Sequence, residues 1–152
     1  MNGEMVARCG LLKLVAGLVL LIGTARGAWA DGAAAEDTRT RLGLTPGERA
    51  EFLAEMRQML ASVQGIIAGI GAGEREQIGA AARLSGNRMA RATPDPVRAR
   101  LPQEFKNLGG PTHLLFEEIA IRAETDDMSS LARLAGETLQ QCLACHTRFR
   151  AD

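Results

Sequence analysis

The feature that most constrains this chain is the segment LQQCLACHTRFR, residues 139–150, near the end of the sequence. It places Cys142 and Cys145 three positions apart, with His146 directly after them. A Cys-x-x-Cys-His run is typical of covalent haem attachment, while a Cys-x-x-Cys pair also occurs in zinc sites and redox dithiols. Each alternative requires a different fold and compartment, so the rest of the sequence has to decide between them.

The first 30 residues are predicted to be a secretory signal peptide. Arg8 and Lys13 form a positive start, residues 14–23 form an apolar stretch, and Ala28-Trp29-Ala30 is a cleavage signal. The apolar stretch is about ten residues long, whereas a helix that spans a bilayer needs roughly 20. We therefore expect a periplasmic protein, exported and cleaved after Ala30, with no stable membrane span in the mature chain; an uncleaved anchor is the alternative.

The charge of the mature chain limits the classes of partner that it can be expected to bind, and its cysteine content limits the role of the motif. The signal peptide carries three of the 18 basic and one of the 18 acidic side chains, which leaves 15 against 17, a net charge of −2. This small net charge does not argue for nucleic acid or an anionic membrane surface as a partner. Cys9 is lost with the signal peptide, so Cys142 and Cys145 remain in an oxidising compartment. A disulfide between them would close a tiny loop and add little stability.

The mature chain is predicted to be all-α. Residues 31–44 are expected to form a mobile N-terminal arm, and residues 45–152 a single folded domain. Thr45 and Glu48 form a capping box around Pro46 at the start of the first helix. Its apolar residues follow a heptad spacing that is typical of packing against neighbouring helices. These residues are Phe52, Met56, Met59, Val63, Ile66 and Ile70.

Three further helices complete the expected domain. The second runs from about Glu74 to Ala92, and three prolines between residues 94 and 102 then predict a non-helical crossing segment. The third begins at Gly110 and ends near Thr125. The fourth is capped by Asp126 or Asp127 and carries the cysteines and Phe149 on one stripe. Because no stretch alternates like a half-buried strand, we expect an antiparallel four-helix bundle.

Haem attachment is the favoured interpretation of the cysteine motif. Two thiols three positions apart on a helix face the same way and can each reach one vinyl edge of a porphyrin. A structural zinc site needs four ligands, and beyond the motif the mature chain offers only His113 and carboxylates. A redox dithiol usually accompanies a βαβ pattern, which is absent from this sequence. Zinc and a plain dithiol remain the alternatives.

The motif and its position resemble the cytochrome c prime family, the class II c-type cytochromes. Residues 142–150, CLACHTRFR, are similar to that family's C-x-x-C-H-x-x-[YF]-R ending, and residues 105–139 are similar to its last two helices. Ordinary class I cytochromes c carry the motif near the N-terminus. The resemblance implies one covalent haem c, held by Cys142 and Cys145, with His146 as the proximal iron ligand. It also implies that Arg150 lies near the exposed haem edge.

The resemblance does not decide which residue, if any, binds the distal face of the iron. In low-spin members similar to cytochrome c-556, a methionine of the first helix ligates the iron, and in others an apolar residue leaves it five-coordinate. Met56 is the favoured distal ligand, Met59 is the second choice, and a gapless alignment would place Arg57 there. Methionines on a helical stripe are often only core residues. His113 is expected to be a surface or capping residue.

The expected function is electron transfer with periplasmic redox partner proteins, through one haem that cycles between Fe(III) and Fe(II). No pair of acid and base groups, nucleophile or substrate pocket is evident, so an enzyme is not expected. The alternative is a five-coordinate binder of NO or CO. A homodimer through the first two helices is possible, because small residues there permit close approach. These residues are Ala68, Gly69, Gly71 and Ala80–Ala82.

Overall fold

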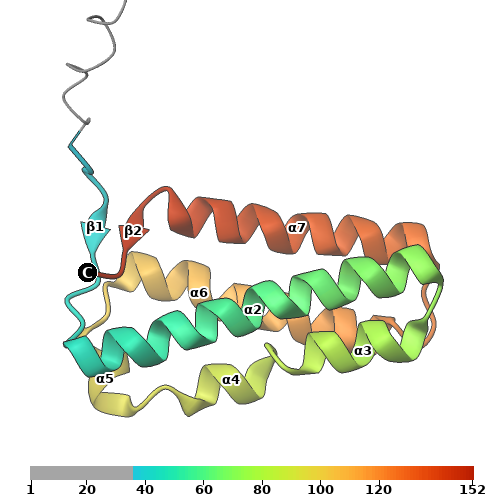
Figure 1. The fold of residues 1–152 in the computed structure, drawn as a ribbon, viewed down its shortest axis with the longest axis horizontal. Coiled ribbons are helices and arrows are strands. Elements are labelled where there is room, and N and C mark those ends of the chain that lie inside the picture. Colours follow the sequence, from blue (N-terminus) through green and yellow to red (C-terminus); the bar gives the residue numbers. More distant parts are fainter. Residues whose placement is uncertain (1–35) are drawn as a thin grey trace, which may run out of the picture. The chain divides into compact units, whose positions relative to one another are not determined.

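The computed structural model describes residues 36–152, which form helices joined by short connections and one pair of very short strands (Figure 1). The elements in chain order are β1 (Thr40–Arg41), α2 (Pro46–Ala72), α3 (Arg75–Arg83), α4 (Asn87–Ala92), α5 (Asp95–Arg100), α6 (Gln103–Arg122), α7 (Met128–His146) and β2 (Phe149–Arg150). The all-α prediction is confirmed. The signal peptide and the first residues of the expected arm lie outside the described residues.

The longer helices pack side by side, and α2, α3, α6 and α7 run alternately in opposite directions (Figure 1). α2 packs on α3, α3 on α6, α6 on α7, and α7 on α2. α4 follows α3 and lies against α6. None of the helices within residues 36–152 combines the length and the hydropathy that a bilayer crossing requires.

The first helix, α2, begins and ends at its sequence signals. Thr45 Oγ1 accepts a hydrogen bond from Glu48 N at 3.4 Å, and Glu48 Oε2 accepts one from Thr45 N at 2.8 Å. The predicted capping box is therefore confirmed, with Pro46 in the first turn. Gly73 ends the helix in the left-handed conformation, with φ 73°, which a residue with a Cβ adopts only at a cost.

Small residues bring α2 and α3 close together. A Cβ added to Gly65 would lie 2.8 Å from Ala81 Cβ, and one added to Gly69 would lie 2.7 Å from Ile78 Cγ1. Gly69 and Ala82 are buried. These small residues therefore serve packing within one chain, and the tightness of the α2–α3 contact explains their presence.

The expected second helix is not continuous. It divides into α3 and α4 at residues 84–86, where Ser85 and Gly86 are buried. Ser85 Oγ lies 2.8 Å from Ser62 Oγ of α2, and His113 Nδ1 of α6 lies 2.7 Å from the Ser85 carbonyl oxygen. Because a carbonyl oxygen only accepts, Nδ1 is the donor. The prediction of one helix from Glu74 to Ala92 is therefore wrong. Side chains of α2 and α6 bind the hydroxyl and the carbonyl of Ser85, and these contacts stabilise the break between α3 and α4.

The prolines mark helix starts. Pro94 and Pro102 directly precede α5 and α6, and Pro96 lies in the first turn of α5. A proline at these positions removes no hydrogen bond of the helix interior. The crossing segment that the sequence predicts as non-helical therefore contains a short helix, α5.

The third long helix, α6, begins at Gln103, so the predicted start at Gly110 is wrong. Pro111 lies inside the helix, although a proline there removes one backbone hydrogen bond. Phe105 and Leu108 pack against an apolar cluster, which keeps the turns before Pro111 in place. Tertiary packing thus overrides the signal of the proline.

The last helix, α7, begins behind Asp127, whose Oδ1 accepts a hydrogen bond from Ser130 N at 2.9 Å. Asp127 is thus the cap, as one of the two predicted alternatives. The helix ends at His146, and Phe149 lies in β2, so the expected extension of the helical stripe to Phe149 is wrong. The chain turns after the motif because β2 pairs with β1.

Residues 40–44 are a packed part of the fold and not a mobile arm. Thr40 N donates to the Arg148 carbonyl at 2.8 Å, and Leu42 N donates to the Arg150 carbonyl at 3.1 Å, so β1 and β2 pair in parallel. Leu42 is only 5% exposed. Strands of two residues are too short for alternation of apolar and polar residues to reveal them.

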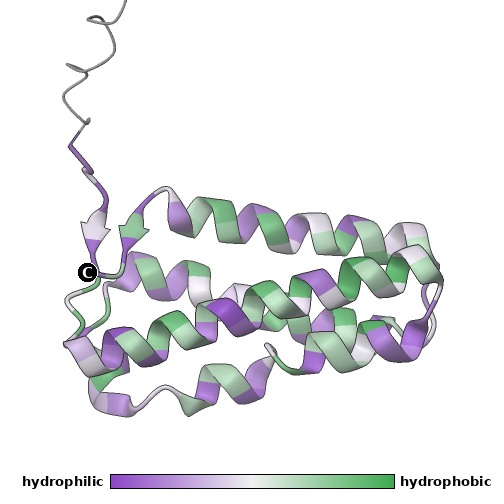
Figure 2. Cartoon of the chain, viewed as in Figure 1, coloured by the Kyte–Doolittle hydropathy of each residue, from purple (hydrophilic) through white to green (hydrophobic). Residues whose placement is uncertain are grey.

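The apolar side chains form two clusters. We name as the central core the buried cluster shared by α2, α3, α6 and α7, which comprises Met59, Val63, Ile66, Ile78, Ala82, Phe116, Ile119, Ala120, Ala123, Leu131, Leu134 and Ala135. The second, named the motif-end cluster, comprises buried Leu42, Leu101 and Phe149 with half-buried Leu44, Phe52, Phe105, Leu108 and Cys145. Hydrophobic and hydrophilic residues interleave along each long helix, as expected for helices with one buried face (Figure 2).

Candidate functional site

The Cys-x-x-Cys-His motif forms the last turns of α7. Cys142 and Cys145 are three positions apart on the helix and therefore project from the same side of it. Both thiols are free and half-buried. His146 is the last residue of the helix, and its side chain is exposed. The helical setting that the sequence analysis assumes for the two thiols is therefore confirmed.

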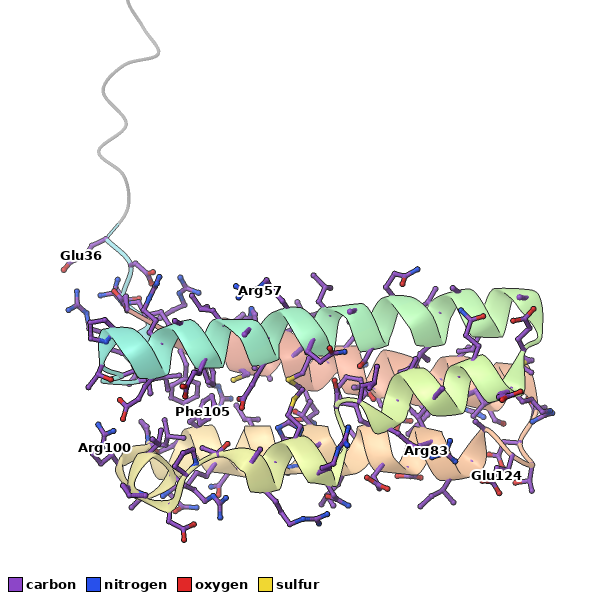
Figure 3. The ribbon with its side chains drawn as sticks, turned by 60° about the horizontal axis from the view of Figure 1, so that its bottom comes forward. Glu36, Arg57, Arg83, Arg100, Phe105 and Glu124 are labelled. Atoms are coloured by element: carbon purple, nitrogen blue, oxygen red, sulfur yellow. The ribbon has the colours of Figure 1, made fainter. Side chains whose placement is uncertain are left out.

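Aromatic rings gather beside the motif. Cys145 packs against the motif-end cluster, which holds three of the four phenylalanines of the chain. The ring centroids of Phe52 and Phe105 are 5.8 Å apart, and those of Phe105 and Phe149 are 5.5 Å apart with the rings at 89°. Phe105 belongs to α6, and its side chain lies between this helix and α2 (Figure 3). The second thiol of the motif thus borders an apolar, ring-lined environment.

The structure separates the three residues of α2 that the sequence offers for the distal side. Met59 is buried in the central core, and Met56 is half-buried against it. Arg57 is exposed and projects from the outer side of α2 (Figure 3). Met56 follows Phe52 by one helical turn, about 6 Å along the axis. Of these three, Met56 therefore lies inward and nearest along α2 to the motif-end cluster.

Arg150 lies in β2, four positions after His146. Its Nη1 is 3.2 Å from Asp152 Oδ2. The carbonyl of His146 accepts a hydrogen bond from Arg39 Nη1 at 3.1 Å, which neutralises part of the negative end of the α7 dipole. The two arginines thus lie on the segment that follows the motif and on the segment that precedes β1.

The environment of the thiols disfavours a redox dithiol. Burial raises the pKa of Cys142, and burial together with the neighbouring Cys142 raises the pKa of Cys145. Reactive Cys-x-x-Cys pairs instead have a lowered thiol pKa, and they gain it at helix N-termini or beside cations. Here the pair lies at the C-terminal, negative end of α7. Burial and the negative helix end both favour the neutral thiol over the thiolate that dithiol exchange requires.

The described part of the chain offers no ligand set for a structural zinc site. Within residues 36–152, no group of three or more histidine, cysteine, aspartate or glutamate side chains is arranged to hold a metal ion. His113, the other histidine of the chain, is committed to the Ser85 carbonyl through Nδ1. The donor set beside the apolar cluster, two thiols and one imidazole on the final turns of a helix, fits a covalently attached haem.

One titratable residue of this region was missed by the sequence analysis. Glu55 is half-buried on α2, and burial, together with the nearby Glu51, raises its pKa. It lies three positions after Phe52 and four before Met59, so it shares the inward side of the helix with both. That spacing was visible in the sequence, but a glutamate beside a heptad seam is easily assigned to the solvated face.

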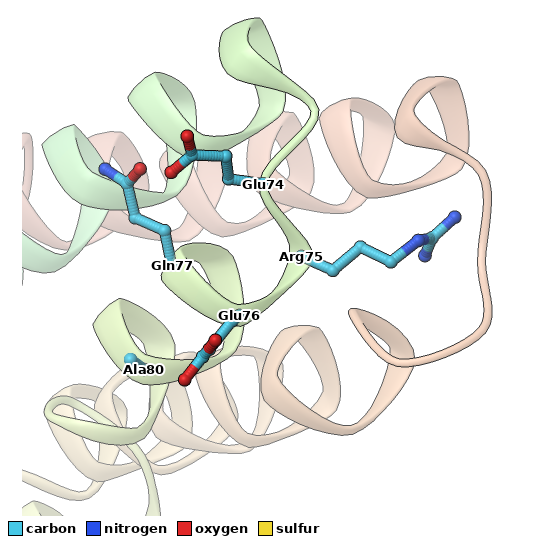
Figure 4. A pocket seen from close by; sticks show the side chains of 5 residues that line it. All are labelled: Glu74, Arg75, Glu76, Gln77 and Ala80. Atoms are coloured by element: carbon cyan, nitrogen blue, oxygen red, sulfur yellow. The ribbon is translucent and has the colours of Figure 1, made fainter.

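A surface hollow lies at the other end of the helices. It is lined by Glu74, Arg75, Glu76, Gln77 and Ala80 at the start of α3 (Figure 4). These residues include neither a thiol nor a histidine, and the hollow lies where α2 turns into α3. It has no part in the site at the end of α7.

Comparison with protein-family models, with curated proteins and with solved structures gives no match to this chain. The functional assignment therefore rests on the motif and its surroundings.

Proposed function

We propose that this chain is an exported c-type cytochrome of the cytochrome c prime class that carries electrons in the periplasm. The observation that supports the proposal most is the placement of the motif. Two free, half-buried thiols lie three positions apart at the end of α7, directly before His146 and beside a cluster with three phenylalanines. We further propose that α2, α3–α4, α6 and α7 constitute the four-helix bundle of that class, which the circular packing of these helices supports.

In this proposal each residue of the motif has a distinct role. Cys142 and Cys145 would form the two thioether bonds, and His146 would be the proximal iron ligand. Bound haem c supplies one-electron chemistry between Fe(III) and Fe(II). The phenylalanines of the motif-end cluster pack against Cys145 and would contact the haem there, and Arg150 would offset the charge of a propionate.

Met56 is proposed as the distal ligand, because it is the inward-facing methionine next to Phe52. A thioether opposite an imidazole favours Fe(II) and raises the reduction potential. Met56 and His146 would together hold the iron in both oxidation states, which suits a carrier. Met59 is the second choice, and its burial in the central core makes it the less accessible of the two.

The first test is covalent attachment. The chain is expressed with a c-type cytochrome maturation system, purified and denatured, and its mass and visible absorption are measured. We expect one haem per chain. Cys145→Ala should leave the haem attached through a single thioether bond, and Cys142→Ala/Cys145→Ala should abolish the covalent attachment. Leu143→Ala, between the two cysteines and 66% exposed, is the matched control and should retain the haem. A colourless wild-type chain would refute the proposal.

The second test separates the carrier from the ligand binder. The holoprotein should show a low-spin spectrum with a thioether-to-iron charge-transfer band, which Met56→Ala removes and Met59→Ala leaves in place. A high-spin ferric spectrum of the wild type, with prompt CO binding after reduction, would instead support the five-coordinate binder of NO or CO. Loss of the band in Met59→Ala alone would move the distal role to Met59.

A further inference from the structure

The last turn of α7 has its carbonyl groups satisfied from outside the helix. The last four carbonyls of a helix lack partners within it. Thr147 N donates to the Leu143 carbonyl at 3.0 Å, and Thr147 Oγ1 donates to the Ala144 carbonyl at 3.1 Å. Arg148 N donates to the Cys145 carbonyl at 3.0 Å. The two residues that follow the motif thus satisfy three of these four carbonyls.

The fourth carbonyl belongs to His146, and its partner comes from near the start of the described part of the chain. Arg39 Nη1 donates to it at 3.1 Å, across 107 positions of sequence. A hydrogen bond from a charged donor is stronger than one between neutral groups. A cation at the C-terminal end of a helix also interacts favourably with the helix dipole. The bond therefore ties the backbone of the expected iron ligand to a segment that is distant in sequence.

That segment is packed against the residues after the motif. β1 lies beside β2 (Figure 1), and Thr40 N and Leu42 N donate to the carbonyls of residues 148 and 150 at 2.8 Å and 3.1 Å. Leu42 is 5% exposed, so its side chain anchors the segment in the motif-end cluster. Gly43, between β1 and α2, has φ 66°, a left-handed conformation that favours glycine. We name residues 39–43 the strap.

We propose that the strap is a positioning element that fixes His146 for binding to the haem iron. The inference rests on the proposed function, because it takes His146 as the proximal ligand. Groups that hold a metal ligand in place raise the affinity of the site, since the ligand loses less freedom when the metal binds. The strap acts on the backbone of His146, and Arg39 adds a positive charge there, which favours Fe(II) over Fe(III). Arg39 is thus a positioning residue.

The first experiment measures the reduction potential of the holoprotein by spectroelectrochemistry. Arg39→Gln removes the charge from the His146 carbonyl, so at a fixed applied potential the ratio of Fe(II) to Fe(III) should fall about threefold. Arg39→Lys keeps a positive charge and N–H donors, and it should restore most of this ratio. A contribution to stability alone would leave the ratio the same in all three proteins, and that result would overturn the inference.

Arg49→Gln is the matched control for the loss of charge. Arg49 lies on α2, and its Nε donates at 2.6 Å to the Ala151 carbonyl, five positions after His146. The variant therefore removes the same charge and the same kind of bond, from a guanidinium to a backbone carbonyl, without touching the carbonyl of His146. We expect the ratio of Fe(II) to Fe(III) to change by less than about twofold. Equal effects of Arg39→Gln and Arg49→Gln would reduce the result to net charge and overturn the inference.

The second experiment tests whether the strap fixes the last turn of α7. Amide hydrogen exchange in the ¹⁵N-labelled reduced holoprotein reports local opening. Leu42→Ala removes the buried anchor of the strap, so the amides of Thr147 and Arg148 should exchange about tenfold faster or more. Leu131→Ala makes the same substitution in the central core, at a residue of α7 that is 0% exposed, and should change these two rates by less than about twofold. Equal acceleration by the two variants would overturn the inference.

A second strap variant covers the case that Leu42→Ala does not fold, because Leu42 also belongs to the motif-end cluster. Gly43→Ala strains the left-handed turn, although a Cβ at this position meets nothing within 4 Å. It should speed the exchange of the same two amides and shift the potential in the same direction as Arg39→Gln. A chain that acquires no haem would refute the proposed function and the positioning role together. A holoprotein whose potential and exchange rates do not respond to any change in the strap would refute only the strap.

Discussion

The central core and the motif-end cluster are built from different residues and in different ways. The central core is mainly aliphatic side chains and alanine from four helices, with Phe116 as its one aromatic residue among the described residues. Phe116 is completely buried. The motif-end cluster holds the other three phenylalanines, and its members come from α2, α6, α7, β2 and the connections that follow β1 and α5. Two of its three rings, Phe52 and Phe105, are only half-buried.

The comparison shows that packing between helices is enough to bury the central core, whereas the motif-end cluster stays partly exposed. Heptad seams on facing helices bury the central core, so its closure needs nothing beyond the helices. The motif-end cluster is assembled where helices end, and it keeps apolar ring surface partly exposed beside the thiols. In the proposed function, a covalently held haem supplies the missing apolar contact at this end, at roughly 25 cal/mol per Å² buried.

The largest expected effect compares one phenylalanine from each cluster. Phe116→Ala should lower the free energy of unfolding by about 3–5 kcal/mol, because it leaves a cavity in a closed core. Phe105→Ala should cost the haem-free chain clearly less, about 1–2 kcal/mol, because the ring is half-buried and solvent can fill the gap. Urea unfolding followed by circular dichroism measures both. In the holoprotein, Phe105→Ala should also shift the haem absorption bands, which Phe116→Ala leaves unchanged. Equal losses of stability in the haem-free chain would remove the distinction between the clusters.

A smaller effect is expected at the polar pair beside the central core. Ser62 and Ser85 are 1% and 0% exposed, and their hydroxyl oxygens lie 2.8 Å apart. Ser62→Ala should destabilise the chain by about 1–3 kcal/mol, because it leaves the Ser85 hydroxyl buried without this partner. The double variant Ser62→Ala/Ser85→Ala should cost less than the single one, since no hydroxyl is left over. Additive losses in the same unfolding measurement would show that the pair is not coupled.

The smallest effects concern two carboxylates whose pKa values shift in opposite directions. Burial raises the pKa of Glu55, next to the motif-end cluster, so stability is lost as the pH rises through that pKa. Hydrogen bonds from the Ser129 hydroxyl and from the backbone and hydroxyl of Ser130 lower the pKa of Asp127, at the start of α7. Its contribution is therefore present above the ordinary pKa of an aspartate and is lost as the pH falls.

Two amide variants test these signs. Glu55→Gln should raise the melting temperature slightly at neutral pH and leave it unchanged below about pH 4. Asp127→Asn should lower it at neutral pH, and the difference should shrink as the solution is acidified. Thermal unfolding of the haem-free chain between about pH 3 and pH 8 measures both. A stabilising effect of Glu55→Gln that persists in acid would contradict the role assigned to burial.

The errors of the sequence analysis share one physical origin. Pro111 lies inside α6 and residues 84–86 interrupt the second helix, because contacts with other parts of the chain outweigh local preference at both places. The triplet Ser85-Gly86-Asn87 was a visible turn signal within an alanine-rich stretch. The role of His113 was not visible, because its partner, the Ser85 carbonyl, lies 28 positions away in the sequence.

The sequence by itself determined the helical class, the capped start of the first helix, the start of the last one and the motif with its spacing. These depend on interactions between residues a few positions apart, which a sequence displays directly. Only the tertiary structure decided that β1 pairs with β2, that three phenylalanines meet beside Cys145, and that Arg39 binds the His146 carbonyl at the end of α7. These features join residues from about forty to about a hundred and ten positions apart, and their energies come from burial and charge between segments that only the folded chain brings together.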